Sequence, residues 1–189
     1  MICLICNTNH NLEICPNCNF IQRKKTLNKE EEKQRYLQHN NSLANQGYVD
    51  MLNNFYKKIK PYIKGKSILD FGSGPSPVFS QLIENVDIYD IHFQPKKISK
   101  SYDVITMIEV IEHLENPLKI LTNLKQHLNP GGIFGVMTLF HTDNVENWWY
   151  MTDPTHISFF NKKTIRFLAS KLKMRILFID DKNTFVLGV

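Results

Sequence analysis

The sequence predicts an α/β fold built on a parallel sheet, and three observations point to it. A short apolar run at residues 67–71 leads into a turn with two glycines, and residues 78–84 then have apolar side chains at helical spacing. A second apolar run, 86–90, ends in an acidic residue. A third, 102–110, is followed by a helical pattern and a fourth run. Repeated strand and helix patterns of this kind are typical of parallel sheets covered by helices.

The turn after the first run predicts the ligand-binding edge of this sheet. Gly72 and Gly74, on either side of Ser73, lack a Cβ and let the backbone approach a ligand closely. A Gly-x-Gly turn can also be purely structural. Asp90, however, lies twenty residues after Asp70, where an acid can accept ribose hydroxyls. The pattern therefore predicts a ligand that contains a nucleoside.

Length and composition set broad limits. The 189 residues suit one domain with attachments, and 42% hydrophobic residues are ordinary for a globular chain. No run approaches the ~20 apolar residues that cross a bilayer, and the first residues lack a signal pattern. We expect a cytoplasmic protein without a membrane partner. The net charge of +5 is compatible with nucleic acid but does not establish it.

The amino-terminal residues 1–21 predict a small zinc ribbon. All four cysteines lie there as two C-x-x-C pairs with eight residues between them: Cys3, Cys6, Cys15 and Cys18. Four thiolates at this spacing suit tetrahedral zinc, and disulfides are unusual in the cytoplasm. Asn7 and Asn19 follow the second cysteines, where a left-handed conformation is often needed. We expect a hairpin at 9–14. Unmetallated thiols are the alternative, and such a ribbon can touch nucleic acid or support a neighbouring domain.

Residues 22–63 predict a helical connector. Residues 22–46 have mixed charges, which favours a solvated helix. His39 lies in a polar cluster that either ends this helix or caps the ligand site. Gly47 interrupts the pattern, and residues 48–63 then form an amphipathic helix that should pack on the sheet.

Only residues 91–101 separate the second and third apolar runs. A right-handed crossover between parallel strands needs a dozen or more residues. The strand that usually follows in such folds is therefore absent or reduced to a stub near 97–99.

The segment 108–114 predicts a charged cluster at the carboxyl edge of the sheet. Glu109, Glu112 and His113 would share one face if the chain coils here. Two carboxylates and an imidazole in a cavity need protons, partners or a metal to neutralise them.

The later elements follow ordinary signals. Asn116 caps a helix over 116–127 with Pro117 in its first turn, and a Pro-Gly-Gly turn leads into a strand at 133–140. Asn161 caps a helix at 162–171, and strands at 174–179 and 184–189 close the fold.

The loop 141–160 follows a strand and should overhang the site. It carries Trp148, Trp149 and Tyr150, which either stack on a planar substrate or plug the loop against the core. His156 lies ahead of the next helix.

Four motifs together resemble the class I S-adenosylmethionine (SAM) methyltransferases over residues 64–189: ILDFGSG at 68–74, YDVIT at 102–106, EVIEHL at 109–114 and LNPGGIF at 128–134. The resemblance implies a Rossmann-like fold that is shortened around its third strand. It implies SAM contacts from Asp70, Gly72, Ser73, Gly74, Asp90, Ile91 and Glu109. The family's third glycine is Ser76 here, between two prolines. Ile91, Phe93 and Ile98 would wall the adenine in place of the shortened region.

Glu109, Glu112, His113 and His156 also resemble a narrower group, the metal-dependent O-methyltransferases. Members act on the 3′-terminal ribose of small RNAs, and ubiquinone-pathway enzymes that act on catechols share the Glu-x-x-Glu-His motif. This implies a catalytic divalent ion held by these four residues, and methyl transfer to a hydroxyl of RNA or of a small hydroxylated metabolite.

Two alternatives remain open. In metal-free methyltransferases a similar stretch packs under the methyl group of the cofactor, and His113 or His156 could then act as a general base. The second alternative is a zinc-ribbon RNA-binding module whose methyltransferase domain is degenerate.

Overall fold

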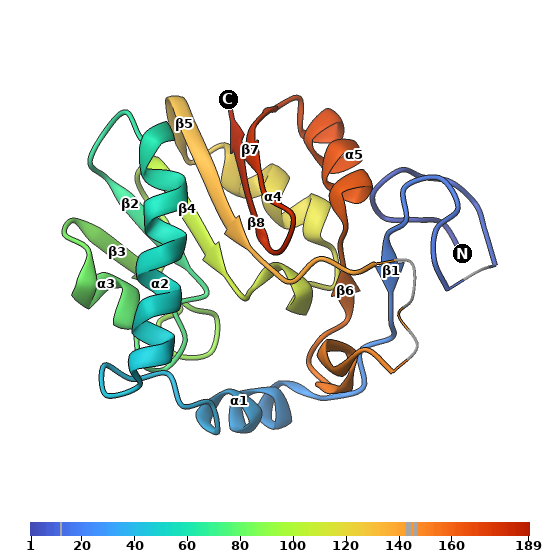
Figure 1. Cartoon of the computed structure of the whole chain (residues 1–189), viewed down its shortest axis with the longest axis horizontal. Coiled ribbons are helices and arrows are strands. Elements are labelled where there is room, and N and C mark those ends of the chain that lie inside the picture. The colour runs from blue at the N-terminus through green and yellow to red at the C-terminus, as the bar shows by residue number, and fades with distance from the viewer. Residues whose placement is uncertain (12, 143–144, 146) are drawn as a thin grey trace.

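Six strands form one sheet in the order β3-β2-β4-β5-β8-β7 (Figure 1). Their bounds are β2 Ile68–Phe71, β3 Val86–Tyr89, β4 Tyr102–Ile108, β5 Leu128–Met137, β7 Arg175–Ile179 and β8 Thr184–Gly188. The first four strands in this order are parallel, and β8 pairs antiparallel with both β5 and β7. The computed structural model describes residues 1–11, 13–142, 145 and 147–189. The predicted α/β class is confirmed.

Helices cover both faces of the sheet. One face carries α2 (Gln46–Ile59), the short η1 (Lys60–Tyr62) and α3 (Val78–Leu82), and the other carries α4 (Pro117–Lys125) and α5 (Lys162–Leu172). Asn116 and Asn161 cap α4 and α5, as predicted. Gly47 was expected to interrupt the helical pattern, but it does not. It lies in the first turn of α2, because Asn45 caps that helix one residue before Gln46.

The sheet lacks a strand between β3 and β4. Residues 91–101, all of which the structure describes, form only an isolated bridge between Asp90 and Gln94. Strand β2 pairs with β3 on one side and with β4 on the other, and among the described residues no further strand pairs with β3, which is therefore an edge strand. The prediction of an absent third strand is confirmed. Strand β5 begins at Leu128, earlier than expected, and Gly131 in its Pro-Gly-Gly stretch has a φ of +76°.

The amino-terminal ribbon packs onto the sheet domain beside α5. Each pair of cysteines lies on its own turn, flanked by a bridge between Ile2 and Asn9 or between Ile14 and Ile21. The expected hairpin at 9–14 is therefore not formed by the described residues of that stretch, and residue 12 lies outside them. Two residues, β1 (Ile21–Gln22), leave the ribbon and pair antiparallel with β6 (Ser158–Phe159).

Helix α1 (Lys29–Leu37) lies along the carboxyl edge of the parallel strands (Figure 1). Its start is defined by a capping box, in which Asn28 accepts from the Glu31 amide and Glu31 accepts from the Asn28 amide. Much of the helix is exposed, as its charges predicted. Glu32 is the exception at 5% exposed, where its carboxylate lies 3.0 Å from Lys25 Nζ and 3.5 Å from His92 Nε2.

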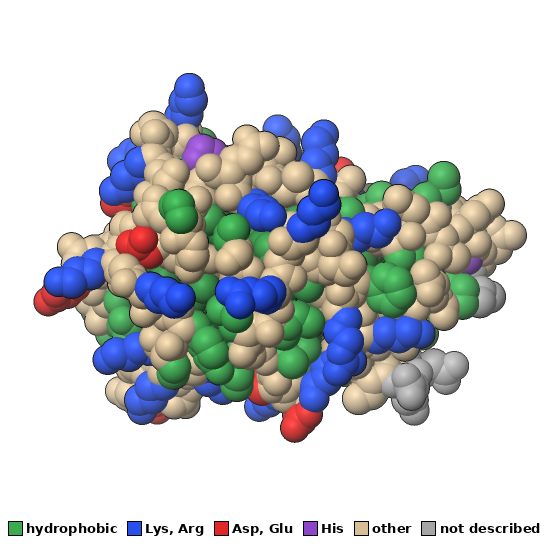
Figure 2. Space-filling model, turned by 90° about the horizontal axis from the view of Figure 1, so that it is seen from above, with side chains coloured by type: hydrophobic (Ala, Val, Ile, Leu, Met, Phe, Trp, Pro, Cys, Tyr) green, Lys and Arg blue, Asp and Glu red, His purple; other side chains and the backbone are tan. Residues whose placement is uncertain are grey.

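The opposite face, seen from above in Figure 2, carries many Lys and Arg side chains. Lysines also lie in the last turns of three helices, as Lys58 in α2, Lys125 in α4 and Lys171 in α5. Cations there complement the negative end of the helix dipole, and Lys58 is also paired with Asp180 at 2.6 Å. Among the described residues, no helix has both the length and the apolar character needed to span a bilayer.

Candidate functional site

A cavity of about 870 Å³ opens at the carboxyl edge of the parallel strands. Its walls come from the glycine turn after β2, the end of β3, residues 108–110 and 113–116, helices α1 and α2, and residues 149–156. Binding pockets for small ligands commonly have volumes of about 300–1,000 Å³. The cavity is therefore large enough for a nucleoside cofactor together with part of an acceptor.

Close packing of Val110 against the glycine turn leaves no room for a side chain at position 72. Gly72 has a φ of +82°, and a Cβ there would lie 2.5 Å from Cγ2 of Val110. The carboxylate of Asp90 holds the turn, accepting from the Gly74 amide at 3.0 Å and from the His92 amide at 2.8 Å. Gly72, Ser73, Gly74 and Asp90 all line the cavity, as their predicted role requires.

Asp70 does not line the cavity. Its side chain lies beneath the turn and accepts from the Thr106 hydroxyl at 3.0 Å. Burial raises the pKa of Asp70 to about 7. The structure therefore places Asp70 under the cofactor turn, where its contact is with β4.

The cavity wall at residue 91 is only partly closed. Ile91 lines the cavity and is 63% exposed, whereas Phe93 and Ile98, the other residues expected to wall the adenine, do not line it.

Three of the four predicted catalytic residues lie together. Ligand atoms of Glu112, His113 and His156 all lie within 4.8 Å of one another. Glu112 and His113 belong to η2 (Ile111–His113), directly after β4, and His156 belongs to the turn before β6. Glu112 is fully buried, and one of its carboxylate oxygens, Oε2, has no hydrogen-bond partner among the described residues.

Both imidazoles of this cluster present Nε2 as a proton-free acceptor. His113 Nδ1 lies 3.1 Å from the Thr155 carbonyl oxygen, and His156 Nδ1 lies 2.7 Å from that of Tyr150. A carbonyl oxygen can only accept, so each Nδ1 carries the proton. Burial lowers the pKa of His113 to about 3 and also lowers the pKa of His156. Neutral imidazoles fixed in this tautomer have the form that metal ligands need.

Glu109 and Glu112 share the hydroxyl of Tyr150. The distances are 2.8 Å to Glu109 Oε2 and 2.5 Å to Glu112 Oε1. One phenol donates a single hydrogen bond, so the second contact requires a proton on a carboxyl group. Burial raises the pKa of both acids, and the charge of Glu109 raises the pKa of Glu112 further. Glu109, which has a φ of +53°, lies outside the three-residue cluster.

The aromatic residues of the loop have three different positions. Trp149 lines the cavity and is 67% exposed. Trp148 does not line it, and packs against Tyr150 and Phe159. Tyr150 is buried at the cavity wall. Trp148 therefore packs against the core, as one alternative for this loop predicted, whereas stacking of Trp149 on a substrate stays a prediction. His39, also expected at the substrate, lines the cavity.

Sequence reasoning missed two contributions of α1. Tyr36 packs edge-on against His113, with ring centroids 5.3 Å apart, and Glu32 Oε2 lies 3.5 Å from His92 Nε2. The signal was present in the Asn28–Glu31 capping box. A helix that begins there places Glu32 and Tyr36 on one face.

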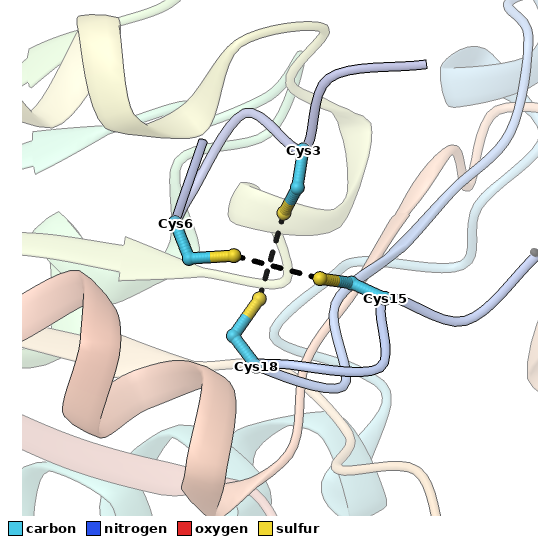
Figure 3. A group of neighbouring side chains, drawn as sticks. All are labelled: Cys3, Cys6, Cys15 and Cys18. Atoms are coloured by element: carbon cyan, nitrogen blue, oxygen red, sulfur yellow. Dashed lines mark hydrogen bonds between the residues drawn. The ribbon is translucent and has the colours of Figure 1, made fainter. Parts of the chain in front are cut away.

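The four cysteines form a closed cluster with the geometry of a zinc site (Figure 3). The Sγ atoms of Cys3 and Cys18 are 3.5 Å apart, as are those of Cys6 and Cys15. Asn7 and Asn19 have φ values of 63° and 60°, as predicted. Burial raises the pKa of Cys3 and Cys18. It also acts to raise the pKa of Cys6, but hydrogen bonds from Thr8 outweigh it and lower that pKa to about 6.

Residues 44–172 match the family described as "Methyltransferase domain". The match covers more than half of the chain, and the chain belongs to this family. Over 43 residues it is also 46% identical to the ubiquinone biosynthesis O-methyltransferases of Rickettsia canadensis and Rickettsia typhi. That segment is 23% of this chain and only 18% of each relative.

Solved structures share the fold at low identity. The plantazolicin methyltransferase BpumL in complex with SAH is 14% identical, with a TM-score of 0.56, over 85% of this chain and 91% of that one. A SAM-dependent methyltransferase of Thermotoga maritima is 13% identical, with a TM-score of 0.54, over 85% and 95%. A Haloferax volcanii methyltransferase in complex with the Trm112 activator is 14% identical, with a TM-score of 0.52, over 77% and 94%. The family match identifies a methyltransferase domain, and the solved structures share its fold.

Proposed function

We propose that the protein transfers the methyl group of SAM to a hydroxyl that has a second hydroxyl beside it, with help from a divalent ion. The observation that carries the proposal is one cavity lined both by the glycine turn and by His113 and His156, which form a cluster with the buried Glu112. A SAM molecule on the turn would present its methyl group towards that cluster.

The cofactor part of the proposal rests on the turn and Asp90. Gly72 and Gly74 leave room for the methionine end of SAM, and Asp90 retains free lone pairs for the ribose hydroxyls after accepting three backbone amides. Ile91 would contact the adenine, and Glu109 lies on the wall between cofactor and cluster.

The metal part rests on the donor set. Glu112 has an unpartnered buried oxygen, His113 and His156 each have a proton-free Nε2, and ligand atoms of the three residues lie within 4.8 Å of one another. A mixed carboxylate and imidazole set suits Mn²⁺, Fe²⁺ or Zn²⁺ better than Mg²⁺. A bound ion would hold adjacent hydroxyls and make them more acidic. The carbonyl groups of Thr155 and Tyr150 keep the imidazoles oriented. Glu109, the fourth ligand that the motif implies, lies outside this three-residue set and accepts from the Tyr150 hydroxyl.

Two observations favour two different classes of methyl acceptor. Lys29, Lys119 and the exposed Trp149 line the same cavity, which suits the phosphates and base at the end of an RNA strand. The curated relatives are instead named for ubiquinone biosynthesis, which suits a small hydroxylated metabolite. Both acceptors offer the adjacent hydroxyls that the cluster would bind.

Transfer of labelled methyl from SAM tests the proposal. RNA and small hydroxylated metabolites from cells are fractionated and assayed with added Mn²⁺, and His156→Ala serves as the matched variant. We expect label in one fraction, dependent on the ion and reduced in the variant. Equal labelling by both proteins in the presence and absence of the ion would exclude the metal role.

A binding module without turnover is the competing function, favoured by the open adenine side and by Ser76 in place of a third glycine. Calorimetry with SAM distinguishes the two. An absence of binding at millimolar SAM would favour the binding module.

A further inference from the structure

The strand that leaves the ribbon holds the segment that carries Tyr150 and His156. In β1, Ile21 pairs with Phe159 and Gln22 with Ser158. Gln22 Nε2 also donates to the Glu115 carbonyl at 3.0 Å. The strand pairing joins residues more than a hundred positions apart, next to the candidate site.

Arg23 extends this hold to the turn before β6. Its backbone amide donates to the Ile157 carbonyl at 2.8 Å, and its Nη1 donates to the Met151 carbonyl at 2.6 Å. Met151 follows Tyr150, and Ile157 follows His156. One arginine therefore spans the segment that positions both side chains.

The other side of the same segment contacts the motif after β4. The Ile157 amide donates to the Glu112 carbonyl at 2.9 Å, and the Ser158 hydroxyl donates to the Leu114 carbonyl at 2.7 Å. The Thr155 carbonyl accepts from His113 Nδ1. Residues 155–158 thus lie between β1 and the catalytic motif, and a shift of β1 would move them.

The position of β1 depends in turn on the second cysteine turn. The buried Thr164 hydroxyl of α5 donates to the Cys18 carbonyl at 2.8 Å, and His141 Nε2 lies 2.8 Å from the Asn19 carbonyl oxygen. Phe20 packs against Phe160 with ring centroids 5.3 Å apart. Each of these anchors lies at Cys18 or within two residues of it, so the geometry of the cysteine cluster sets where β1 begins.

We propose that the four-cysteine ribbon is an internal brace of the methyltransferase site, and that Arg23 is its positioning residue. With its metal bound, the ribbon fixes β1, and β1 fixes residues 150–158 against η2. The brace itself is a structural property, and its effect on catalysis rests on the proposed function.

The two tryptophans give a direct readout. Trp148 and Trp149 are the only tryptophans in the chain, and both lie in the turn whose Met151 carbonyl Arg23 binds. Tryptophan fluorescence therefore reports on the braced segment alone. Hydrogen exchange of peptides over 155–159 reports on the same segment without optical probes.

The test compares Arg23→Ala with Lys24→Ala in the full-length protein loaded with zinc. Lys24 is the exposed neighbour and makes no hydrogen bond or ion pair with the described residues. We expect Arg23→Ala to raise acrylamide quenching and to speed exchange over 155–159 about five-fold, as loss of the single Nη1 hydrogen bond to Met151 would, while the backbone bond from residue 23 to Ile157 is retained. Lys24→Ala should match wild type, and Arg23→Lys should restore part of the protection.

Kinetics and zinc removal complete the test. With the brace weakened, kcat should fall while the SAM concentration for half-maximal rate stays constant, because the glycine turn is not held by Arg23. Removing zinc under conditions that preserve the far-ultraviolet spectrum should reproduce the fluorescence change. Identical quenching and exchange in the two variants would overturn the brace. If quenching and exchange change only in Arg23→Ala but the wild-type protein transfers no methyl group, the brace stands and the proposed function is overturned.

Discussion

The two donor clusters of this protein are assembled in opposite ways. The cysteine cluster draws all its ligands from positions 3 to 18, on two tight turns with left-handed asparagines. The Glu112, His113 and His156 cluster joins the end of β4 to a turn that the chain reaches only after α4 and β5. The geometry of the cysteine cluster is therefore set by residues close in sequence, whereas the Glu112, His113 and His156 cluster exists only once the sheet has formed.

The donors also differ in how they are kept neutral without an ion. Burial raises the pKa of Cys3 and Cys18, so these thiols hold protons that a metal must displace. Burial lowers the pKa of His113 and His156, so these imidazoles are already in the ligand form, whereas burial raises the pKa of Glu112, so this carboxyl group holds a proton that a metal must displace. The first cluster lies in the hydrophobic core and the second reaches the cavity, so we expect the first to contribute mainly to folding and the second mainly to chemistry.

Replacing a buried cysteine should have the largest effect. Cys18→Ser removes one ligand of a site that lies within the hydrophobic core shared with α5. Structural zinc sites contribute about 10 kcal/mol or more of binding free energy to folding, so we expect a loss of at least ~4 kcal/mol in the free energy of unfolding. Urea denaturation and zinc content by mass spectrometry measure it. Retention of one tightly bound zinc at wild-type stability would contradict a structural role.

The raised pKa of Asp70, a buried carboxyl group outside both clusters, can be tested through the pH dependence of unfolding. Its folded-state pKa of about 7 lies above the ordinary value of 3.8, so folding favours the protonated form. This contribution is fully present below about pH 4 and is lost as the pH rises through 7. We expect the unfolding free energy of wild type to fall between pH 4 and 8 by about 3–4 kcal/mol more than that of Asp70→Asn. Denaturation midpoints that change equally in the two proteins across this range would show that the carboxyl is not perturbed.

His156→Ala separates the second cluster from the first. It removes one imidazole but leaves all four cysteines, so the bound metal should fall to the ribbon zinc alone. Methyl transfer should drop about 100-fold, while the far-ultraviolet spectrum is retained. Metal content after dialysis against Mn²⁺ and a methyl-transfer assay measure both effects. Full Mn²⁺ binding by this variant would remove His156 from the metal site.

Glu109→Gln should have the smallest effect on the metal. The Glu109 side chain reaches the Tyr150 hydroxyl and lies outside the three-residue cluster. We expect less than a ten-fold loss of Mn²⁺ affinity by calorimetry, which corresponds to less than about 1.4 kcal/mol. A loss as large as that of His156→Ala would make Glu109 a direct ligand, as its motif implies.

Sequence reasoning was most successful where structure depends on neighbours in the chain. The strand and turn at 67–74, the caps Asn116 and Asn161 and the left-handed Asn7 and Asn19 were all predicted. Each rests on backbone conformation within a few residues. The missing third strand was also predictable, because the length of 91–101 forbids a crossover.

It was least successful at predicting which face of a helix is buried and which segments, distant in sequence, come into contact. The charged composition of α1 hid the buried Glu32, and Trp148 and Trp149 could not be told apart by sequence. Asp70 matches the cofactor motif but contacts Thr106 instead of the cavity. Each of these outcomes depends on which distant segment packs nearby, which spacing along the chain does not encode.

The sequence by itself determined the class of fold, the cysteine cluster and the cofactor turn, because each depends on short-range spacing and on glycine or asparagine conformations. Tertiary structure alone decided that Tyr150 bridges two glutamates, that α1 closes the cavity, and that β1 joins the ribbon to the segment that carries His156. These contacts are made across large sequence separations, and their geometry follows from the packing of the whole sheet domain.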